Sequence, residues 1–133
     1  MKIPIWGISS LLAASATSGL MLLLSEQTAV ACSCALVKEK EYFQRADVVF
    51  TGTVIERYSS KTEANVWIFT VDKVLKGDAI GEQDVSSPKM SSLCGAYFEM
   101  NARYQVYATN VDGRLETILC SGNRELPKKA ASQ

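Results

Sequence analysis

The alternation of apolar and polar side chains predicts a mostly β chain after residue 31. Residues 47–56 and 65–75 are rich in β-branched and aromatic residues. In the second segment Trp67, Phe69 and Val71 recur at every other position. This period is typical of a strand with one buried face. We therefore expect Trp67 and Phe69 to lie in a core rather than to form a platform for a ligand.

Three further segments complete the predicted sheet. They are a weak strand over 83–86, a clear strand over 103–109 and a return strand over 115–119, and an Asp-Gly dipeptide typical of tight hairpins joins the last two. Gly52, inside the first strand, predicts the bulge or sharp bend that a closed barrel needs. Five strands in about 100 residues favour a five-stranded OB-like closed barrel with short flanking helices.

The ends of this sheet region predict a helix and a tail. Residues 36–46 contain good helix formers and neither glycine nor proline, which favours a short helix with Leu36, Phe43 and Ala46 on one face. The chain is polar from Ser121 onward and is expected to fray, and we assign residues 127–133 as a flexible tail.

The first 31 residues have the pattern of an export signal. Lys2 precedes an apolar or small stretch over residues 3–24, and a polar break and the small-x-small sequence Ala-Val-Ala follow at residues 25–31. We predict a signal peptide over residues 1–31, a mature chain beginning at Cys32, and a secreted, periplasmic or cell-surface location. The alternative is an uncleaved anchor, because the apolar stretch is long enough to span a bilayer.

Composition excludes several classes of function. The chain has 14 basic and 14 acidic residues and no histidine, so its formal net charge is zero. Without histidine, neither a Ser-His-Asp or Cys-His nucleophile nor a His-ligated zinc site can form. Tyr97, Tyr104 and Tyr107 could suggest base stacking, but neutral charge and export argue against nucleic acid. We expect no enzyme activity and no cofactor of its own.

The cysteines predict a crosslinked N-terminus. All four, Cys32, Cys34, Cys94 and Cys120, follow residue 31, and an even count in a small exported chain indicates two disulfides. A link between Cys32 and Cys34 is disfavoured because a ring spanning a single intervening residue is strained. The other two pairings both remain open at this point. A metal or redox site at the Cys-x-Cys sequence is the alternative interpretation.

Several motifs follow one another in an order known from one family. They are Cys-Ser-Cys at 32–34, a helix ending in Phe43, Ala-Asp-Val-Val at 46–49, Val-Leu-Lys-Gly at 74–77, Ser-x-Cys-Gly at 92–95, and a hairpin before Cys120. In this order the chain resembles the N-terminal, netrin-like domain of the tissue inhibitors of metalloproteinases, over residues 32–126. The resemblance implies an OB-type barrel with disulfides Cys32–Cys94 and Cys34–Cys120. It also implies a minimal, monomeric, single-domain inhibitor of a zinc-dependent endopeptidase.

The chain departs from that family at a few positions. Gln44 stands where the family has a further cysteine, and the partner of that cysteine is also missing, so the count stays even. Ala35 and Leu36 stand where a proline is common. The C-terminal domain of the animal inhibitors has no counterpart in this sequence.

The resemblance further implies that the backbone of Cys32 binds the zinc of the target protease. A catalytic zinc keeps one position open for water. The α-amine and the carbonyl oxygen of Cys32 would displace that water as a five-membered chelate. The ordinary pKa of an α-amine is about 7.7–8.0, so a useful fraction is neutral at physiological pH.

The neighbouring side chains would then fill the substrate cleft. Ser33 would enter the pocket that follows the scissile bond, and Cys34, Ala35 and Leu36 would continue along the primed side. Ser92 and Leu93 would fill the unprimed side, although they could instead form a plain loop with Leu93 in the core.

Two other functions remain open from the sequence. Netrin-like domains also occur as non-inhibitory interaction modules, and a fold does not fix a function. The second alternative is a lipoprotein attached to a membrane through Cys32, but Ala29 stands where leucine is usual. Lipidation would also leave one of the four cysteines unpaired, and without it no membrane contact is expected.

Overall fold

The computed structural model describes residues 32–61 and 64–130. The predicted signal peptide and residues 131–133 lie outside the described residues. In chain order the elements are α1 (Glu39–Arg45), β1 (Val48–Ser59), β2 (Ala64–Lys76), β3 (Glu82–Pro88), the 3-10 helix η1 (Ser91–Leu93), β4 (Arg103–Val111), β5 (Arg114–Glu116), the 3-10 helix η2 (Leu119–Ser121) and β6 (Arg124–Leu126). None of the helices among these residues is long and apolar enough to cross a membrane.

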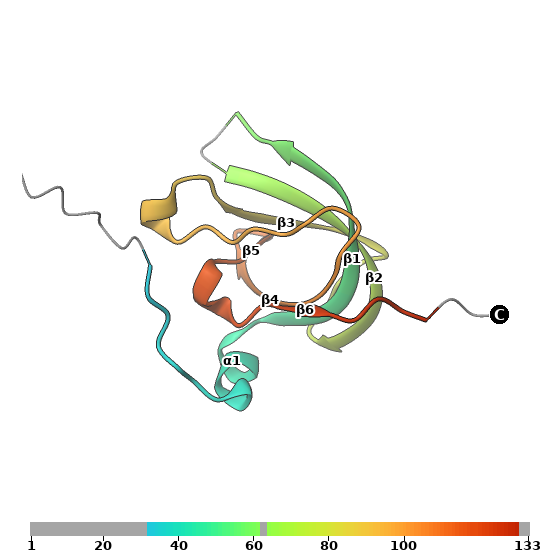
Figure 1. Cartoon of the computed structure of the whole chain (residues 1–133), viewed down its shortest axis with the longest axis horizontal. Coiled ribbons are helices and arrows are strands. Elements are labelled where there is room, and N and C mark those ends of the chain that lie inside the picture. The colour runs from blue at the N-terminus through green and yellow to red at the C-terminus, as the bar shows by residue number, and fades with distance from the viewer. Residues whose placement is uncertain (1–31, 62–63, 131–133) are drawn as a thin grey trace, which may run out of the picture.

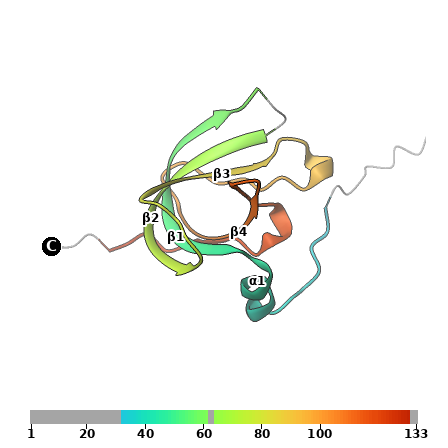
Figure 2. The ribbon, with the colours of Figure 1, turned by 180° about the vertical axis from the view of Figure 1, so that it is seen from behind.

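Strands β1 to β5 form a ring around one core (Figures 1 and 2). β1 is antiparallel to both β2 and β4, and the pairs β2–β3 and β4–β5 are also antiparallel. A single parallel residue pair, Ser86 with Glu116, joins β3 to β5. The prediction of a mainly β fold with short helices is confirmed, with five strands in the ring and a sixth, β6, added beside β4. The contact between β3 and β5 is the weakest in the ring, because it consists of one residue pair.

Gly52 lets β1 bend sharply enough to pair with two neighbours. The register between β1 and β2 shifts between Thr51 and Gly52. A Cβ atom at Gly52 would lie only 2.7 Å from the carbonyl oxygen of Thr70, so no larger residue fits without displacing β2. The predicted bulge at this glycine is therefore confirmed.

Aromatic side chains from several segments fill the ring. The ring of Phe98 makes edge contacts with Trp67, Phe69 and Tyr104 at centroid distances of 5.3, 5.1 and 4.9 Å. Trp67 is fully buried and its Nε1 donates to the Phe98 carbonyl at 3.1 Å, which satisfies its polar atom. The core role predicted for Trp67 and Phe69 is confirmed. Tyr104 and Tyr107 are buried too, and burial raises the pKa of both phenols.

The helix is shorter than the sequence predicts, and its apolar face is different. Leu36 lies outside α1 and is fully exposed, and Phe43 is 37% exposed and not part of the core. The residue that packs on the ring is Tyr42, whose ring lies 6.1 Å from that of Tyr107, beside the buried Ala46. The expectation for Leu36 was wrong because the two disulfides hold residues 32–34 in an extended segment that delays the start of the helix.

The end of the domain also differs from the prediction. β5 stops at Glu116, and the chain turns into η2 instead of continuing as a strand to Leu119. The chain does not fray from Ser121, because β6 pairs with β4. Asn123 anchors this region: its Oδ1 accepts from the backbone N–H of Tyr107 at 2.8 Å. A polar sequence is here ordered by tertiary hydrogen bonds.

Asp72 links β2 to β4 and to the C-terminal segment. Its carboxylate accepts from Arg103 Nε at 2.9 Å and from Lys129 Nζ at 3.0 Å. Burial alone would raise the pKa of Asp72, but the hydrogen bonds and charges of Arg103 and Lys129 together lower it below its ordinary value of 3.8.

A lowered pKa in the folded state gives Asp72 a predictable effect on acid stability. Its contribution is fully present above its ordinary pKa and is lost as the pH falls through the lowered value. We expect Asp72→Asn to remove part of the acid dependence of the free energy of unfolding below about pH 5. Urea unfolding of both proteins between neutral and acid pH measures this, and identical acid dependence would contradict the assignment.

Candidate functional site

Residues 32–38 run as an extended segment along one side of the ring before α1 begins (Figure 1). Two disulfides fix this segment. Cys32 is bonded to Cys94 at a Cα–Cα distance of 5.6 Å, and Cys34 to Cys120 at 5.2 Å. Of the two pairings that the sequence leaves open, the structure has the one that the family resemblance implies.

The end of η1 is held rigidly, which fixes the position of Cys94. Cys94 has a positive φ of 58°, an uncommon conformation for a residue with a side chain. The next residue, Gly95, lies so close to the carbonyl oxygen of Pro88 that a Cβ atom would collide with it. The N–H of Ala96 then donates to the buried Ser87 Oγ at 2.7 Å. Glycine at position 95 is therefore required by the backbone contact at the end of β3.

The two loops that carry the disulfides are joined to each other. The N–H of Leu119 donates to the carbonyl of Cys94 at 2.7 Å, and Gly95 forms an isolated antiparallel bridge with Ile118. The N–H of Ile118 is also bonded to Ser121 Oγ at 3.0 Å, which shapes η2. As a result three segments, residues 32–36, 92–94 and 118–120, lie on one surface, which we call the ridge.

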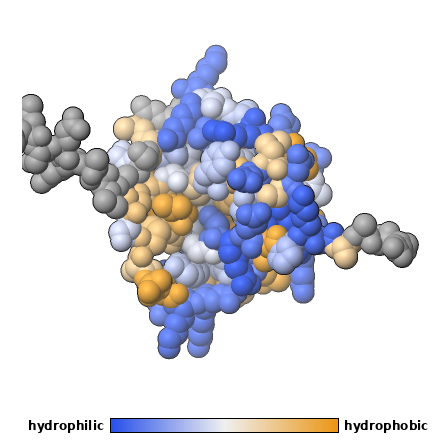
Figure 3. Space-filling model, viewed as in Figure 1, coloured by the Kyte–Doolittle hydropathy of each residue, from blue (hydrophilic) through white to orange (hydrophobic). Residues whose placement is uncertain are grey.

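The ridge presents apolar side chains to solvent. Leu36 is fully exposed, Leu93 is 53% exposed and Leu119 is 52% exposed. Figure 3 shows apolar side chains gathered on the side of the molecule where η1, η2 and the N-terminal segment lie. The alternative that Leu93 belongs to the core is wrong. A surface with several large exposed apolar residues in one place is typical of an interaction site.

The structure brings the predicted site residues together. Ser33, Cys34 and Ala35 are exposed beside Leu36, and Ser92 is exposed beside Leu93. Two ridge residues are not among those predicted from the sequence, because residues 115–119 were expected to form one strand, whereas β5 ends at Glu116. Ile118 and Leu119 precede a disulfide partner of the N-terminal segment, and that link was the signal that could have found them.

Helix α1 supports the N-terminal segment from behind. The Tyr42 hydroxyl donates to the carbonyl of Ala35 at 3.5 Å, and the Tyr42 ring covers Gly122, leaving no room there for a Cβ atom. The end of α1 is tied to β2 by Lys76, whose Nζ donates to the carbonyl of Gln44 at 3.3 Å. This bond fixes the end of the helix at Gln44.

The ridge carries no charge of its own. Its residues include no acidic or basic side chain, and its four cysteines are all disulfide-bonded. Within residues 32–61 and 64–130, no group of three or more His, Cys, Asp or Glu side chains is placed to hold a metal ion. What the ridge offers chemically is backbone polar groups, hydroxyls and apolar contacts.

Comparison with protein families shows which family the chain belongs to. Residues 30–130 match the family model described as tissue inhibitor of metalloproteinase. The chain belongs to the tissue inhibitor of metalloproteinase family. A search of curated proteins found no match to the sequence. The family assignment covers the whole described domain, including the ridge and all four cysteines.

Membership of the tissue inhibitor of metalloproteinase family supports inhibition of metalloproteinases as the function at the level of the family. It is also in keeping with a binding protein rather than an enzyme, and with export. The roles of Cys32, Ser33 and the other ridge residues remain predictions from the resemblance.

Proposed function

We propose that the mature protein inhibits a zinc-dependent endopeptidase by placing the α-amine and carbonyl oxygen of Cys32 on the catalytic zinc. The observation that carries this proposal is the position of Cys32 on the ridge. Its disulfide to Cys94 sets it between the exposed residues 33–36 and the exposed residues 92–93. A protease cleft that received the ridge would therefore meet the backbone of Cys32 between two flanking arms.

The chemistry needs a compact donor that can replace the zinc-bound water. A neutral amine and the carbonyl of the same residue meet that need, because together they close a five-membered chelate on the open position. The Cys32 sulfur is bonded to Cys94 and is not the ligand. Because the crosslink already restricts the backbone, little conformational entropy is lost on binding.

The side chains on both arms would provide affinity without charge. Ser33 would enter the pocket that follows the scissile bond, and Leu36 would lie further along the primed side. Leu93 would lie on the unprimed side, with Ser92. The exposed leucines would be removed from water only in the complex. Each would therefore contribute to binding without contributing to folding.

Removal of residues 1–31 is a required step in this proposal. As long as Ala31 is attached, the Cys32 nitrogen is an amide, whose lone pair is delocalised into the carbonyl group. Cleavage at the predicted signal-peptidase site would therefore activate the inhibitor and export it in one event. Intact mass and N-terminal sequencing of the exported protein test this step, and a lipid on Cys32 would favour the membrane-anchored alternative.

Ser33 offers a test of the pocket role that does not disturb the fold. The side chain is exposed, so Ser33→Gly should change the free energy of unfolding by less than about 0.5 kcal/mol. If Ser33 enters a protease pocket, the same change should weaken inhibition of several zinc endopeptidases. Inhibition constants and melting temperatures of the two proteins are the measurements.

The matched control is Ser59→Gly, which alters an exposed serine at the end of β1 and outside the ridge. This variant should inhibit as the parent does. Equal inhibition by Ser33→Gly and the parent across the whole panel would remove the pocket role assigned to Ser33.

A further inference from the structure

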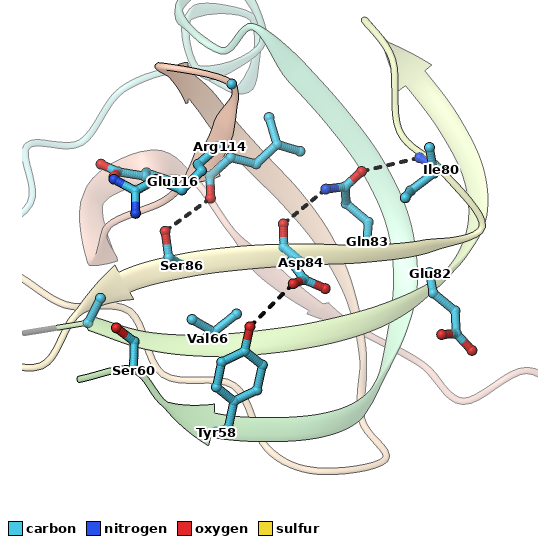
Figure 4. A pocket seen from close by; sticks show the side chains of 13 residues that line it. Tyr58, Ser60, Val66, Ile80, Glu82, Gln83, Asp84, Ser86, Arg114 and Glu116 are labelled. Carbon is cyan, nitrogen blue, oxygen red and sulfur yellow. Dashed lines mark hydrogen bonds between the residues drawn. The ribbon is translucent and has the colours of Figure 1, made fainter. Parts of the chain in front are cut away.

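A second concave surface lies outside the ridge, where a single residue pair joins β3 to β5. It has a volume of about 710 Å³ and is lined by residues from the ends of β1 and β2, from β3 and from β5. This volume falls in the range of known ligand sites. Figure 4 shows β3 running across this groove, with Tyr58 of β1 on one side and Arg114 and Glu116 of β5 on the other. We call it the β3–β5 groove.

The backbone of β3 is only partly paired on the side of the groove. β3 pairs with β2 along its whole length, but with β5 only at Ser86. There the Ser86 carbonyl accepts from the N–H of Thr117 at 2.9 Å. Because the backbone groups of a strand point to its two edges alternately, those of Asp84 and Glu82 face the same edge as those of Ser86. On the N-terminal side of Ser86, β3 therefore presents an edge that another strand can join.

A side chain of the protein itself covers part of this edge. Gln83 Nε2 donates to the carbonyl of Asp84 at 3.0 Å, and Gln83 Oε1 accepts from the N–H of Ile80 at 3.2 Å (Figure 4). The amide of Gln83 thus occupies the hydrogen-bonding position that the backbone of an added strand would take. Rotation of this half-buried glutamine would open the edge without a change in the fold.

The charge of the groove limits the kind of ligand that fits. Its lining includes the carboxylates of Glu82, Asp84 and Glu116 and one cation, Arg114, so three negative charges against one positive leave a formal charge of −2. The Tyr58 hydroxyl donates to Asp84 Oδ2 at 3.3 Å and holds that carboxylate over the groove. Phosphate backbones are repelled by such a surface, whereas lysine and arginine side chains complement it.

We propose that the β3–β5 groove binds an extended, basic peptide segment of a partner protein, which adds as a strand to the edge of β3. Backbone N–H and C=O groups of the segment would pair with those of Asp84 and Glu82 after Gln83 moves aside. Basic side chains at alternate positions would meet the carboxylates of Glu82, Asp84 and Glu116. Ile80, which is 69% exposed at the open end of the groove, would contact an apolar residue of the segment.

The test measures the anisotropy of a labelled, end-capped peptide of alternating lysine and valine, titrated with the full chain in its disulfide-bonded form. We expect saturable binding that weakens as salt rises. Neutralising two carboxylates with Glu82→Gln and Glu116→Gln should weaken binding by about tenfold or more, since each removed charge pair contributes to the complex. The matched control neutralises Glu99 and Glu125, which lie outside the groove, and should leave binding unchanged.

Two further peptides separate strand addition from charge attraction. A peptide of alternating glutamate and valine should not bind. The lysine–valine peptide with alternate backbone nitrogens methylated keeps its charge but cannot pair along one edge, and it should also not bind. Amide resonances of Asp84 and Ser86 should shift on addition of the unmodified peptide.

Several results would overturn the proposal. They are no binding at millimolar peptide, equal binding of the acidic or methylated peptide, unchanged binding by the groove variant, or shifts confined to the ridge. A dimer of the protein that the Glu82→Gln and Glu116→Gln changes disrupt would also overturn it, because the occupant would then be a second copy of this chain.

Discussion

Replacing Cys34 and Cys120 together by serine is expected to lower the free energy of unfolding by about 2–5 kcal/mol. The bond between them joins positions 86 residues apart. Closing a loop of that length restricts the unfolded chain by an amount that the chain-entropy model puts at about 4–5 kcal/mol, an upper value. Small domains are stable by only about 5–15 kcal/mol, so the loss is a large part of the total. Urea unfolding of the parent and the variant measures it.

Removing the other disulfide tests whether the crosslink affects inhibition separately from its effect on stability. The pair Cys32→Ser and Cys94→Ser removes a link of sequence separation 62 but keeps the α-amine and carbonyl of residue 32. We expect a similar loss of stability, together with weaker inhibition at temperatures where the variant is still folded. The reason is that the chelating backbone must then be ordered during binding. Unchanged inhibition by the folded variant would show that the crosslink does not prepare the site.

The long strands and the core were predictable because they depend on local pattern. The alternation around Trp67 and Phe69 specifies a strand with one buried face, and both residues are fully buried. Gly52 was identifiable as a bend because a glycine inside a strand pattern often marks a bulge. In the structure it lies so close to Thr70 that no Cβ atom fits. The pairing of Cys32 with Cys94 was not derivable from spacing, and it came from the family resemblance.

The features that the sequence did not predict depend on contacts between distant residues. Leu36 has a good helical context, but crosslinks at positions 32 and 34 hold the chain extended. β6 is three residues long and mostly polar, and its place is set by pairing with β4. The β3–β5 groove depends on how far two strands diverge after one shared residue pair, Ser86 with Glu116. No local pattern encodes that divergence.

Blocking the α-amine of Cys32 is expected to remove most of the inhibition of zinc endopeptidases. One extra alanine before Cys32 turns its nitrogen into an amide, which is a poor ligand because its lone pair is delocalised. The ring of strands and both disulfides should remain, because the added residue precedes Cys32 and leaves its sulfur bonded to Cys94. The melting temperature should therefore stay the same. Acetylation of the amine should have the same effect on inhibition.

The decisive measurement is a titration of residual activity for a panel of secreted zinc endopeptidases. It compares the mature protein beginning at Cys32, the same protein with one alanine before Cys32, and a control with one alanine after Gln133. Serine proteases in the panel should be unaffected by all three. We predict that the mature protein and the C-terminal control inhibit at least one zinc endopeptidase at micromolar concentration, and that the N-terminally extended protein does not. Equal inhibition by all three would show that the amine is not the ligand, and inhibition by none would favour a non-inhibitory interaction module.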